Sequence, residues 1–396
     1  MRDGWRIETL GDVCDVDKSQ GIYENLPYVG LEDIESRTGR FVGSTQARSV
    51  KSSTFKFSPD HLLFGRLRPY LNKVMLPEFV GHCSTEIFPL KPHPGLSREF
   101  LHYWFLMDRT VDAIDATSTG TRMPRANIGA VLGMDFPFAP LPEQERIVGV
   151  LDEAFEGIAT ARANAEKNVR NARAVMQPAF VAVLAAFDQN GWHTSTVEGA
   201  AKRERGSIRT GPFGSQLLHS EFVDHGIAVL GIDNAVQNRF AWNGRRYITP
   251  QKYAALSRYR VKPGDVLITI MGTCGRCAIV PDDIPTAINS KHLCCITLDR
   301  KKCLPEYLHG YFLWHPAARE FLSKKAKGAI MAGLNMALIK ELPLPLPPVE
   351  QQQVIVERVT EIRKSLENLD AVYRRKLAAL NELKRSLLDQ AFTGEL

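Results

Sequence analysis

The sequence contains a long internal repeat, and this duplication restricts the fold more than any other feature. Residues 139–187 run from a proline-rich step through a Glu-Gln pair into a long, uninterrupted helical pattern. Residues 346–396 repeat the same order, and Pro140 lies 207 positions before its counterpart Pro347. Two long helices, each following a globular segment, are therefore predicted.

The globular segments repeat as well. Gly191 follows Gly4 by 187 positions, and each is followed by tryptophan. Residues 262–281 stand where the first copy has 57–76, a strand, basic turn and strand. Asn335 ends a Gly-rich stretch, 328–335, that matches 120–127 and leads into a proline-rich strand. The sequence predicts α/β (α+β) domains in tandem duplication, with long helices between and after them.

Both long segments carry an apolar seam with alternating steps of four and three residues, which is typical of a helix packed against another helix. The first seam contains Ile147, Leu151, Ala154, Ile158, Ala161, Ala165, Asn168, Ala172, Val175 and Ala179. The second contains Ile355, Val359, Ile362, Leu366, Leu369, Tyr373, Lys376, Leu380, Leu383 and Leu387. Because the first is rich in alanine and the second in leucine, we expect the two helices to pair within one chain.

A second apolar line lies beside the first seam. It consists of Val148, Phe155, Val169 and Met176. This extra width predicts that a third surface packs there, either the globular domains or a partner subunit. Pro178 interrupts the first helical pattern, because proline lacks the N–H of a helical hydrogen bond.

Composition restricts the class of protein. Of the 396 residues, 44% are hydrophobic and 24% charged, as in globular domains with full-sized cores. The opening residues lack the apolar core of a signal peptide, and no stretch approaches the ~20 apolar residues of a membrane span. Seven cysteines in such a chain predict reduced thiols rather than a disulfide framework. We therefore expect a cytoplasmic protein.

Positive charge is concentrated in the second globular segment. Residues 188–349 hold 21 Lys and Arg against 13 Asp and Glu, an excess of eight, while the whole chain has a net charge of +6. A polyanion-binding surface is expected there.

The motifs of several enzyme classes are missing from the sequence. A methyl-donor loop followed by an Asn or Asp before Pro-Pro-aromatic would indicate an adenine methyltransferase, yet residues 346–349 read Leu-Pro-Pro-Val. No GxxxxGK[ST] phosphate loop occurs, and no constellation of paired acids with a lysine suggests a nuclease. Cys274 and Cys277 have zinc-like spacing, but the following Cys294 and Cys295 are adjacent, so reduced thiols are favoured over a metal site. The chain is expected to bind and position rather than to catalyse.

Taken in order, these segments resemble the specificity subunit of type I restriction-modification systems. The resemblance rests on the alternating plan, RLRPYLNKV at 66–74, GPFGS at 211–215, GDVLITIMGTCG at 264–275 and the closing AFTGEL. It covers essentially the whole chain. It implies target recognition domains at 1–142 and 188–349, each reading one half of a split DNA sequence. The helices at 143–187 and 350–396 would then pair as an antiparallel coiled coil that sets the spacer.

The resemblance also implies partners. Two adenine methyltransferase subunits, using S-adenosylmethionine, would dock on the helices, and restriction subunits using ATP and Mg²⁺ can join. The chain itself would hold no cofactor and no metal. A coiled-coil scaffold that does not read DNA is the alternative, and a stand-alone methyltransferase or nuclease is a further rival that the missing motifs disfavour.

Basic and small polar residues in turns are the candidate DNA contacts, because they can bind guanine edges or phosphates. In the first domain these are Arg66, Arg68, Lys73, Arg122 and Arg125. In the second they are Arg209, Gly214, Ser215, Thr273 and Arg276, with Arg245, Arg246, Lys324, Lys325 and Lys327 as phosphate contacts.

Overall fold

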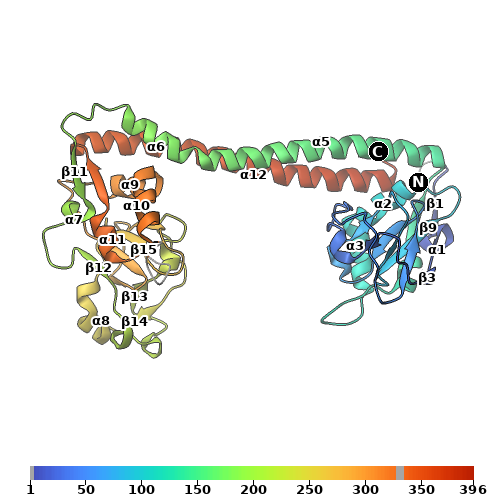
Figure 1. The fold of residues 1–396 in the computed structure, drawn as a ribbon, viewed down its shortest axis with the longest axis horizontal. Helices are drawn as coiled ribbons and strands as arrows, with labels where there is room; N and C mark the ends of the chain where they lie inside the picture. Colours follow the sequence, from blue (N-terminus) through green and yellow to red (C-terminus); the bar gives the residue numbers. More distant parts are fainter. Residues whose placement is uncertain (1–3, 327–333) are drawn as a thin grey trace. The chain divides into compact units, whose positions relative to one another are not determined.

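The computed structural model describes residues 4–326 and 334–396, with the side chains of 324–326 left out. These residues form two compact units. Unit 1 comprises Met1–Lys167 and Tyr373–Leu396, and unit 2 comprises Asn168–Val372. Both divisions fall inside the long helices, so the predicted four-part division at 142, 187 and 349 stays a prediction. Figure 1 follows the elements along the chain by colour.

Unit 1 is built on one antiparallel and one mixed four-stranded sheet and a two-stranded ribbon. The first sheet has the order β2-β9-β6-β7, from Cys14–Val16, Ile87–Pro92, Leu62–Gly65 and Val74–Met75. The second has the order β3-β5-β8-β4, from Gln20–Gly21, Thr54–Phe57, Gly81–Cys83 and Tyr28–Val29. The ribbon pairs β1 (Arg6–Thr9) with β10 (Asp135–Phe138), and the short helices are α1 (Leu10–Val13), α2 (Arg98–Leu106), α3 (Asp108–Ala116) and α4 (Ile128–Leu132).

Unit 2 repeats this plan. Its main sheet has the order β12-β18-β15-β16, from Ile208–Thr210, Leu293–Ile296, Val266–Thr269 and Cys277–Ile279. A smaller sheet has the order β14-β13-β17, from Tyr247–Ile248, Ile227–Leu230 and Ala287–Asn289. The ribbon pairs β11 (His193–Thr196) with β19 (Pro343–Leu346), and the helices are α7 (Val197–Ala200), α8 (Pro250–Leu256), α9 (Pro305–Trp314), α10 (Pro316–Ala326) and α11 (Met336–Glu341).

Strand register shows that the duplication extends to single residues. In unit 1, β6 sets Leu62 opposite Leu90, and in unit 2, β15 sets Val266 opposite Ile296. Asn127 accepts hydrogen bonds from the first turn of α4, as expected of an N-cap residue. Its counterpart Asn335 does the same for α11. The match predicted between 120–127 and 328–335 lies otherwise outside the residues described.

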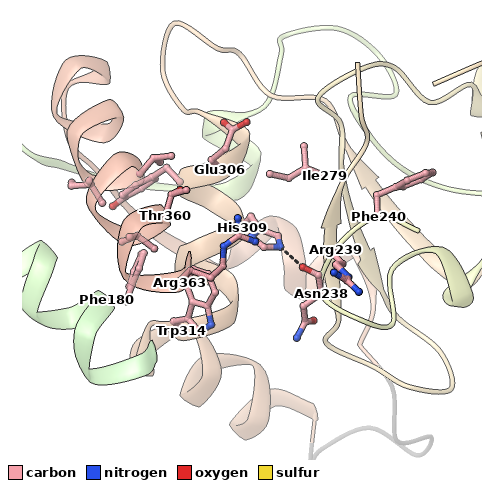
Figure 2. A pocket seen from close by; sticks show the side chains of 14 residues that line it. Phe180, Asn238, Arg239, Phe240, Ile279, Glu306, His309, Trp314, Thr360 and Arg363 are labelled. Atoms are coloured by element: carbon pink, nitrogen blue, oxygen red, sulfur yellow. Dashed lines mark hydrogen bonds between the residues drawn. The ribbon is translucent and has the colours of Figure 1, made fainter. Parts of the chain in front are cut away.

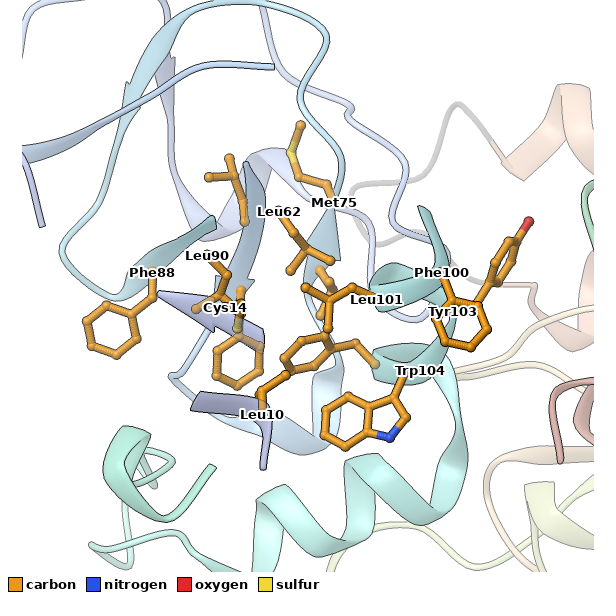
Figure 3. Close-up of a cluster of buried hydrophobic side chains, with 14 of the residues drawn as sticks. Leu10, Cys14, Leu62, Met75, Phe88, Leu90, Phe100, Leu101, Tyr103 and Trp104 are labelled. Carbon is orange, nitrogen blue, oxygen red and sulfur yellow. The ribbon is translucent and has the colours of Figure 1, made fainter. Parts of the chain in front are cut away.

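Each unit buries an aromatic helix against its main sheet. Figure 3 shows Phe100, Leu101 and Trp104 of α2 beside Leu62 of β6 and Leu90 of β9. The apolar positions of α2 recur at helical spacing, which keeps them on the face that meets the sheet. Full burial of one such side chain contributes about 1.5–3 kcal/mol. These aromatics are therefore core residues.

The first long helix breaks near Pro178, as predicted. Helix α5 covers Leu141–Ala174, and α6 covers Met176–Ala185. Val175 between them keeps helical dihedral angles, with φ −68° and ψ −28°. Pro178 has no N–H to donate to the Ala174 carbonyl four residues earlier, so one helical hydrogen bond is missing while the helical backbone continues. By contrast, α12 runs unbroken over 45 residues, Val349–Thr393.

The long helices pair antiparallel within each unit. In unit 1, Arg146 donates to the Leu396 carbonyl (2.8 Å), and Arg162 donates to the Asn381 amide oxygen (3.4 Å). In unit 2, Arg173 and Asp370 form an ion pair of 3.3 Å. As the position on α5 advances, its partner position recedes. The antiparallel coiled coil expected from the sequence is present.

The second seam departs from its predicted path after Leu366. Leu369 and Leu383 are 40% and 47% exposed, and Lys376 is exposed too, so the prediction was wrong at these three positions. The half-buried positions are instead Asp370, Tyr373, Leu377, Leu380 and Lys384. A step of four where three was predicted shifts the phase by one residue. From Leu366 the steps between half-buried positions are four, three, four, three and four residues, which average 3.6, the period of a straight α-helix.

Candidate nucleic-acid interface

A basic loop joins β6 to β7 in the first domain. It spans residues 66–73 and contains two left-handed residues, Arg68 (φ 51°) and Asn72 (φ 45°). Such angles are costly for residues other than glycine and persist only where the surroundings hold them. Here the buried Asn72 amide donates to the Phe105 carbonyl on α2, at 3.1 Å. The loop is therefore fixed to the core.

Tertiary packing brings this loop to the second predicted basic segment. The Arg68 amide donates to the Pro124 carbonyl (2.7 Å), and Leu67 forms a bridge with Arg125. Glu86 accepts from the Nε atoms of both Arg66 and Arg125, each at 2.9 Å. Burial opposes ionisation of Glu86, but the hydrogen bonds from Arg125 and Arg66 lower its pKa. Two segments about 60 residues apart in sequence thus form one basic surface.

The five first-domain candidates divide into three groups. Arg68 and Arg122 are exposed, and their side chains have no ion-pair partner among the residues described. Arg66 and Arg125 are half-buried by their bonds to Glu86. Lys73 is directed inward, and its ammonium donates to the Leu31 and Ile34 carbonyls at 2.6 and 2.9 Å. Lys73 therefore positions the loop at 31–34 and is not retained as a DNA contact.

Arg209 is a core residue, contrary to the prediction that it contacts DNA. It is 8% exposed, and its guanidinium forms an ion pair of 2.7 Å with Asp265, which is 1% exposed. It also donates to the Thr297 hydroxyl at 3.0 Å. A guanidinium so enclosed has no free edge for a base or a phosphate, so Arg209 is withdrawn from the candidate contacts.

Three loops of the second domain meet at one end of its main sheet. They are residues 211–216, 270–276 and 290–292, called here the second-domain loops. The amide of Gly211 donates to the Ser290 carbonyl (3.3 Å), and the amide of Ile270 donates to the His292 carbonyl (2.9 Å). The predicted contacts on these loops, Gly214, Ser215, Thr273 and Arg276, are all exposed.

The two predicted phosphate-contact arginines differ. Arg245 is exposed and makes no ion pair with any described residue, whereas Arg246 pairs with Asp233. Sequence reasoning missed Lys291 and His292, which lie near Arg246. Burial and then the charges of Lys291 and Arg246 lower the pKa of His292. The signal was present in the repeat, because strand register makes His292 the counterpart of Glu86. Lys324 and Lys325 belong to α10, and Lys327 lies outside the described residues.

Comparison with known proteins shows what the chain is similar to. A family model, the type I restriction modification DNA specificity domain, matches residues 234–371. The EcoBI and EcoDI type I specificity subunits of Escherichia coli are each 29% identical to the chain, over 44% and 46% of it. The match spans only 36% and 40% of their own lengths. The MjaVIII specificity subunit of Methanocaldococcus jannaschii is 22% identical over 75% of this chain and 70% of its own.

Residues 234–371 thus match a type I restriction modification DNA specificity domain, and the chain is similar to type I specificity subunits.

Solved structures share the fold of this chain. One is a chain from work on the structural basis of complex assembly and conformational transition of the type I R-M system. Its TM-score to this chain is 0.81 at 21% identity, and the match covers 100% of this chain and 99% of that one. The HsdS subunit from Thermoanaerobacter tengcongensis gives TM-score 0.63 and 21% identity, covering 100% and 98%. These likenesses concern the fold alone.

The predicted third surface beside the first seam is supplied largely by the globular domains of this chain. Phe155 packs edge-on against Tyr103 at 5.4 Å between ring centroids, and the Lys384 ammonium lies 4.8 Å from its ring centroid. Val148 packs against the same core, and Met176 packs against the core of unit 2. Val169 is half-buried. Of the two alternatives, the structure favours the globular domains at three of the four positions.

The cysteines of the second domain lie in the sheet. Cys277 and Cys294 flank Ile268 from the two neighbouring strands, so the central strand separates them. Burial raises the pKa of both thiols, that of Cys294 to about 12. Within residues 4–326 and 334–396, no group of three or more His, Cys, Asp or Glu side chains is placed to hold a metal ion.

A cavity of about 200 Å³ lies between α6, α9 and α12 in unit 2 (Figure 2). Aromatic side chains, among them Phe180 and Trp314, form one wall. His309 Nε2 donates to the Asn238 and Cys277 carbonyls at 3.0 and 3.1 Å, and burial lowers its pKa. A neutral histidine whose Nε2 proton is held by two carbonyls anchors the loop at 238 and is not placed to act as a base.

No described helix is long and apolar enough to cross a membrane.

Proposed function

We propose that the chain is the DNA-reading subunit of a type I restriction-modification complex, and that each globular domain reads one half of a split target. The supporting observation is that, in each copy, loops far apart in sequence converge beside the same edge of equivalent sheets and carry exposed arginines. Base reading needs several side chains held at fixed positions on one surface.

In the first domain, Arg68 and Arg122 are the proposed contacts, because their guanidinium groups are exposed while the backbone beneath them is fixed. Arg66 and Arg125 support them through Glu86. In the second domain, Arg245 and Arg276 have the corresponding freedom. An arginine that binds the O6 and N7 atoms of guanine contributes about 1–3 kcal/mol of discrimination.

The helices are proposed to set the spacer and to dock two adenine methyltransferase subunits. From Ile147 to Gln177 is 30 steps, or about 45 Å at ~1.5 Å per residue, equivalent to about 13 base pairs. The chain lacks motifs for methyl transfer and ATP hydrolysis, so we assign S-adenosylmethionine to the methyltransferase partners. ATP and Mg²⁺ are assigned to a restriction subunit where one joins. We also propose a cytoplasmic location for the complex, because DNA is its proposed target.

Mapping of adenine methylation tests this proposal. Cells coexpressing the chain and its methyltransferase should methylate a bipartite motif that is absent without the chain. Arg68→Ala with Arg122→Ala should relax or lose one half-site only, and Arg245→Ala with Arg276→Ala the other. Lys56→Ala with Lys91→Ala removes the same charge from other exposed positions of the first domain and should leave the motif unchanged. A soluble complex that methylates no new motif would instead support a scaffold.

A further inference from the structure

The second domain has a basic cavity at the end of its main sheet opposite the second-domain loops. The cavity has a volume of about 320 Å³. It is lined by Lys202, Lys262, Pro263, Gly264, Asp265, Thr297, Leu298, Asp299, Arg300, Lys301 and Pro305. These residues adjoin the starts of β12 and β15 and the end of β18, whereas the second-domain loops adjoin the other ends of those strands. The basic cavity is therefore separate from the candidate interface.

The cations of this cavity are largely unneutralised. Lys202, Arg300 and Lys301 are exposed and form no salt bridge with any residue described, while Lys262 pairs with Glu204 at 2.9 Å. Arg300 lies over Gly264, where an added Cβ would fall 2.0 Å from the guanidinium Nη2. Gly264 has φ +77°, so glycine is favoured there on conformational grounds as well. The backbone thus leaves room for a guanidinium at the cavity wall.

The acids nearby are already engaged. Asp265 is buried against Arg209. Asp299 accepts from the Lys301 amide at 3.2 Å and lies 3.9 Å from the Lys302 ammonium. The segments 202–206, 262–265 and 299–302 together carry seven Lys and Arg against three acids, Glu204, Asp265 and Asp299. This net excess of four positive charges accounts for half of the excess in the second domain.

The internal repeat shows that the fold does not require this charge. The equivalent end of the first domain, made of residues 12–17, 58–61 and 91–96, has four acids and one lysine. The acids are Asp12, Asp15, Asp17 and Asp60. Two equivalent structural positions therefore carry opposite charge, so the basic cavity is a property of the second domain alone.

We propose that the basic cavity binds backbone phosphates of double-stranded DNA outside the target sequence. Unpaired Lys and Arg on three converging segments suit a phosphodiester chain, whose binding is driven by counterion release. The lining holds no aromatic side chain on which a base could stack, which disfavours a nucleotide or a single strand. The inference rests on the proposed function, since it adds a second DNA contact to the reading of the target.

The test compares two triple variants of the full chain. Lys202→Ala, Arg300→Ala and Lys301→Ala remove the free cations of the cavity. Lys51→Ala, Lys56→Ala and Lys91→Ala remove the same charge from exposed positions of the first domain and serve as the matched control. Binding of a long random-sequence duplex and of a target duplex is measured by fluorescence anisotropy between 50 and 200 mM salt. Circular dichroism confirms folding of both variants.

The cavity variant is expected to bind the random duplex about tenfold or more weakly, and its slope of log K against log salt should fall by about 2–3, at ~0.9 per phosphate contact. Its preference for target over random duplex should persist. An unchanged slope relative to the control overturns the proposal, as does loss of sequence preference, which would place these residues in the reading surface. Competition by millimolar ATP or inorganic phosphate as strong as that by duplex would overturn it in favour of a small-anion site.

These outcomes are independent of the methylation map. If the native chain specifies no motif, the proposed function fails whatever the salt slope. If a motif appears but the slope does not change, only the inference about the cavity fails.

Discussion

The ion pair between Arg209 and Asp265 has a counterpart in the first domain in which the acidic and basic residue types exchange places. Strand register equates Asp265 with His61, because each precedes the equivalent residues Val266 and Leu62. Arg209 lies opposite Cys295 in the sheet. In the first domain the residue equivalent to Cys295 is Pro89, and its carbonyl accepts from the Asp17 amide, so Asp17 is the counterpart of Arg209. His61 and Asp17 are 3.3 Å apart. In each copy, one pair of an acidic and a basic side chain thus joins the first strand to the central strand, and the two residue types exchange places between the copies.

The two pairs differ in burial, and this difference sets the magnitudes. In the second domain the side chains are 9% and 1% exposed, and Asp265 also accepts from the Thr297 hydroxyl at 2.6 Å and the Lys262 amide at 2.9 Å. Asp265→Asn leaves the Arg209 charge buried without its partner, which costs about 3–5 kcal/mol. The Asp17 side chain is 32% exposed, so Asp17→Asn should cost below about 1 kcal/mol.

Hydrogen exchange measured by mass spectrometry resolves the two domains in the intact chain. Amides of β15 should exchange roughly 100- to 4000-fold faster in Asp265→Asn, since each 1.4 kcal/mol is about a factor of ten, whereas amides of β6 should change little in Asp17→Asn. The double variant Arg209→Met with Asp265→Leu is the control. It removes both charges and should lose less stability than Asp265→Asn alone. Equal, small effects of Asp265→Asn and Asp17→Asn would refute the reasoning.

Three further predictions follow from single contacts. Burial lowers the pKa of His102 to about 4. Between about pH 6.5 and 4 the unfolded chain therefore binds more protons than the folded chain, so the stability of unit 1 should fall as the pH drops through that window. His102→Gln should flatten this pH dependence of stability, measured by urea unfolding. Phe155→Asp buries a charge against Tyr103, so it should destabilise unit 1 by about 2 kcal/mol or more, and an unchanged urea midpoint with loss of methyltransferase binding would show a docking role instead. Four residues inserted into both long helices should lengthen the spacer of the methylated motif by one or two base pairs with both half-sites retained, and an unchanged spacer would exclude the helices as the ruler.

Local pattern carried much of the architecture. Side-chain spacing of 3.6 predicts the long helices wherever an apolar face persists, and repeated punctuation such as the Gly-Trp starts exposes the duplication without knowledge of any contact. Pro178 predicted the break between α5 and α6 because its effect on the backbone is covalent. The turns that carry Arg68 and Arg276 were placed correctly for the same reason, since turn residues act over a few positions.

Contacts between distant residues decided the rest. The sequence by itself determined that Arg68 and Arg209 lie in or beside basic turns, but nothing local shows that one is exposed and the other is paired with Asp265, 56 positions later. Glu86 joins two arginine loops because strand pairing brings it there, and the phase of the α12 seam after Leu366 depends on which face α5 presents. Sequence thus determined the elements and their repeat, whereas tertiary structure decided which charges remain free to bind, because burial and ion pairing depend on neighbours that only the fold brings together.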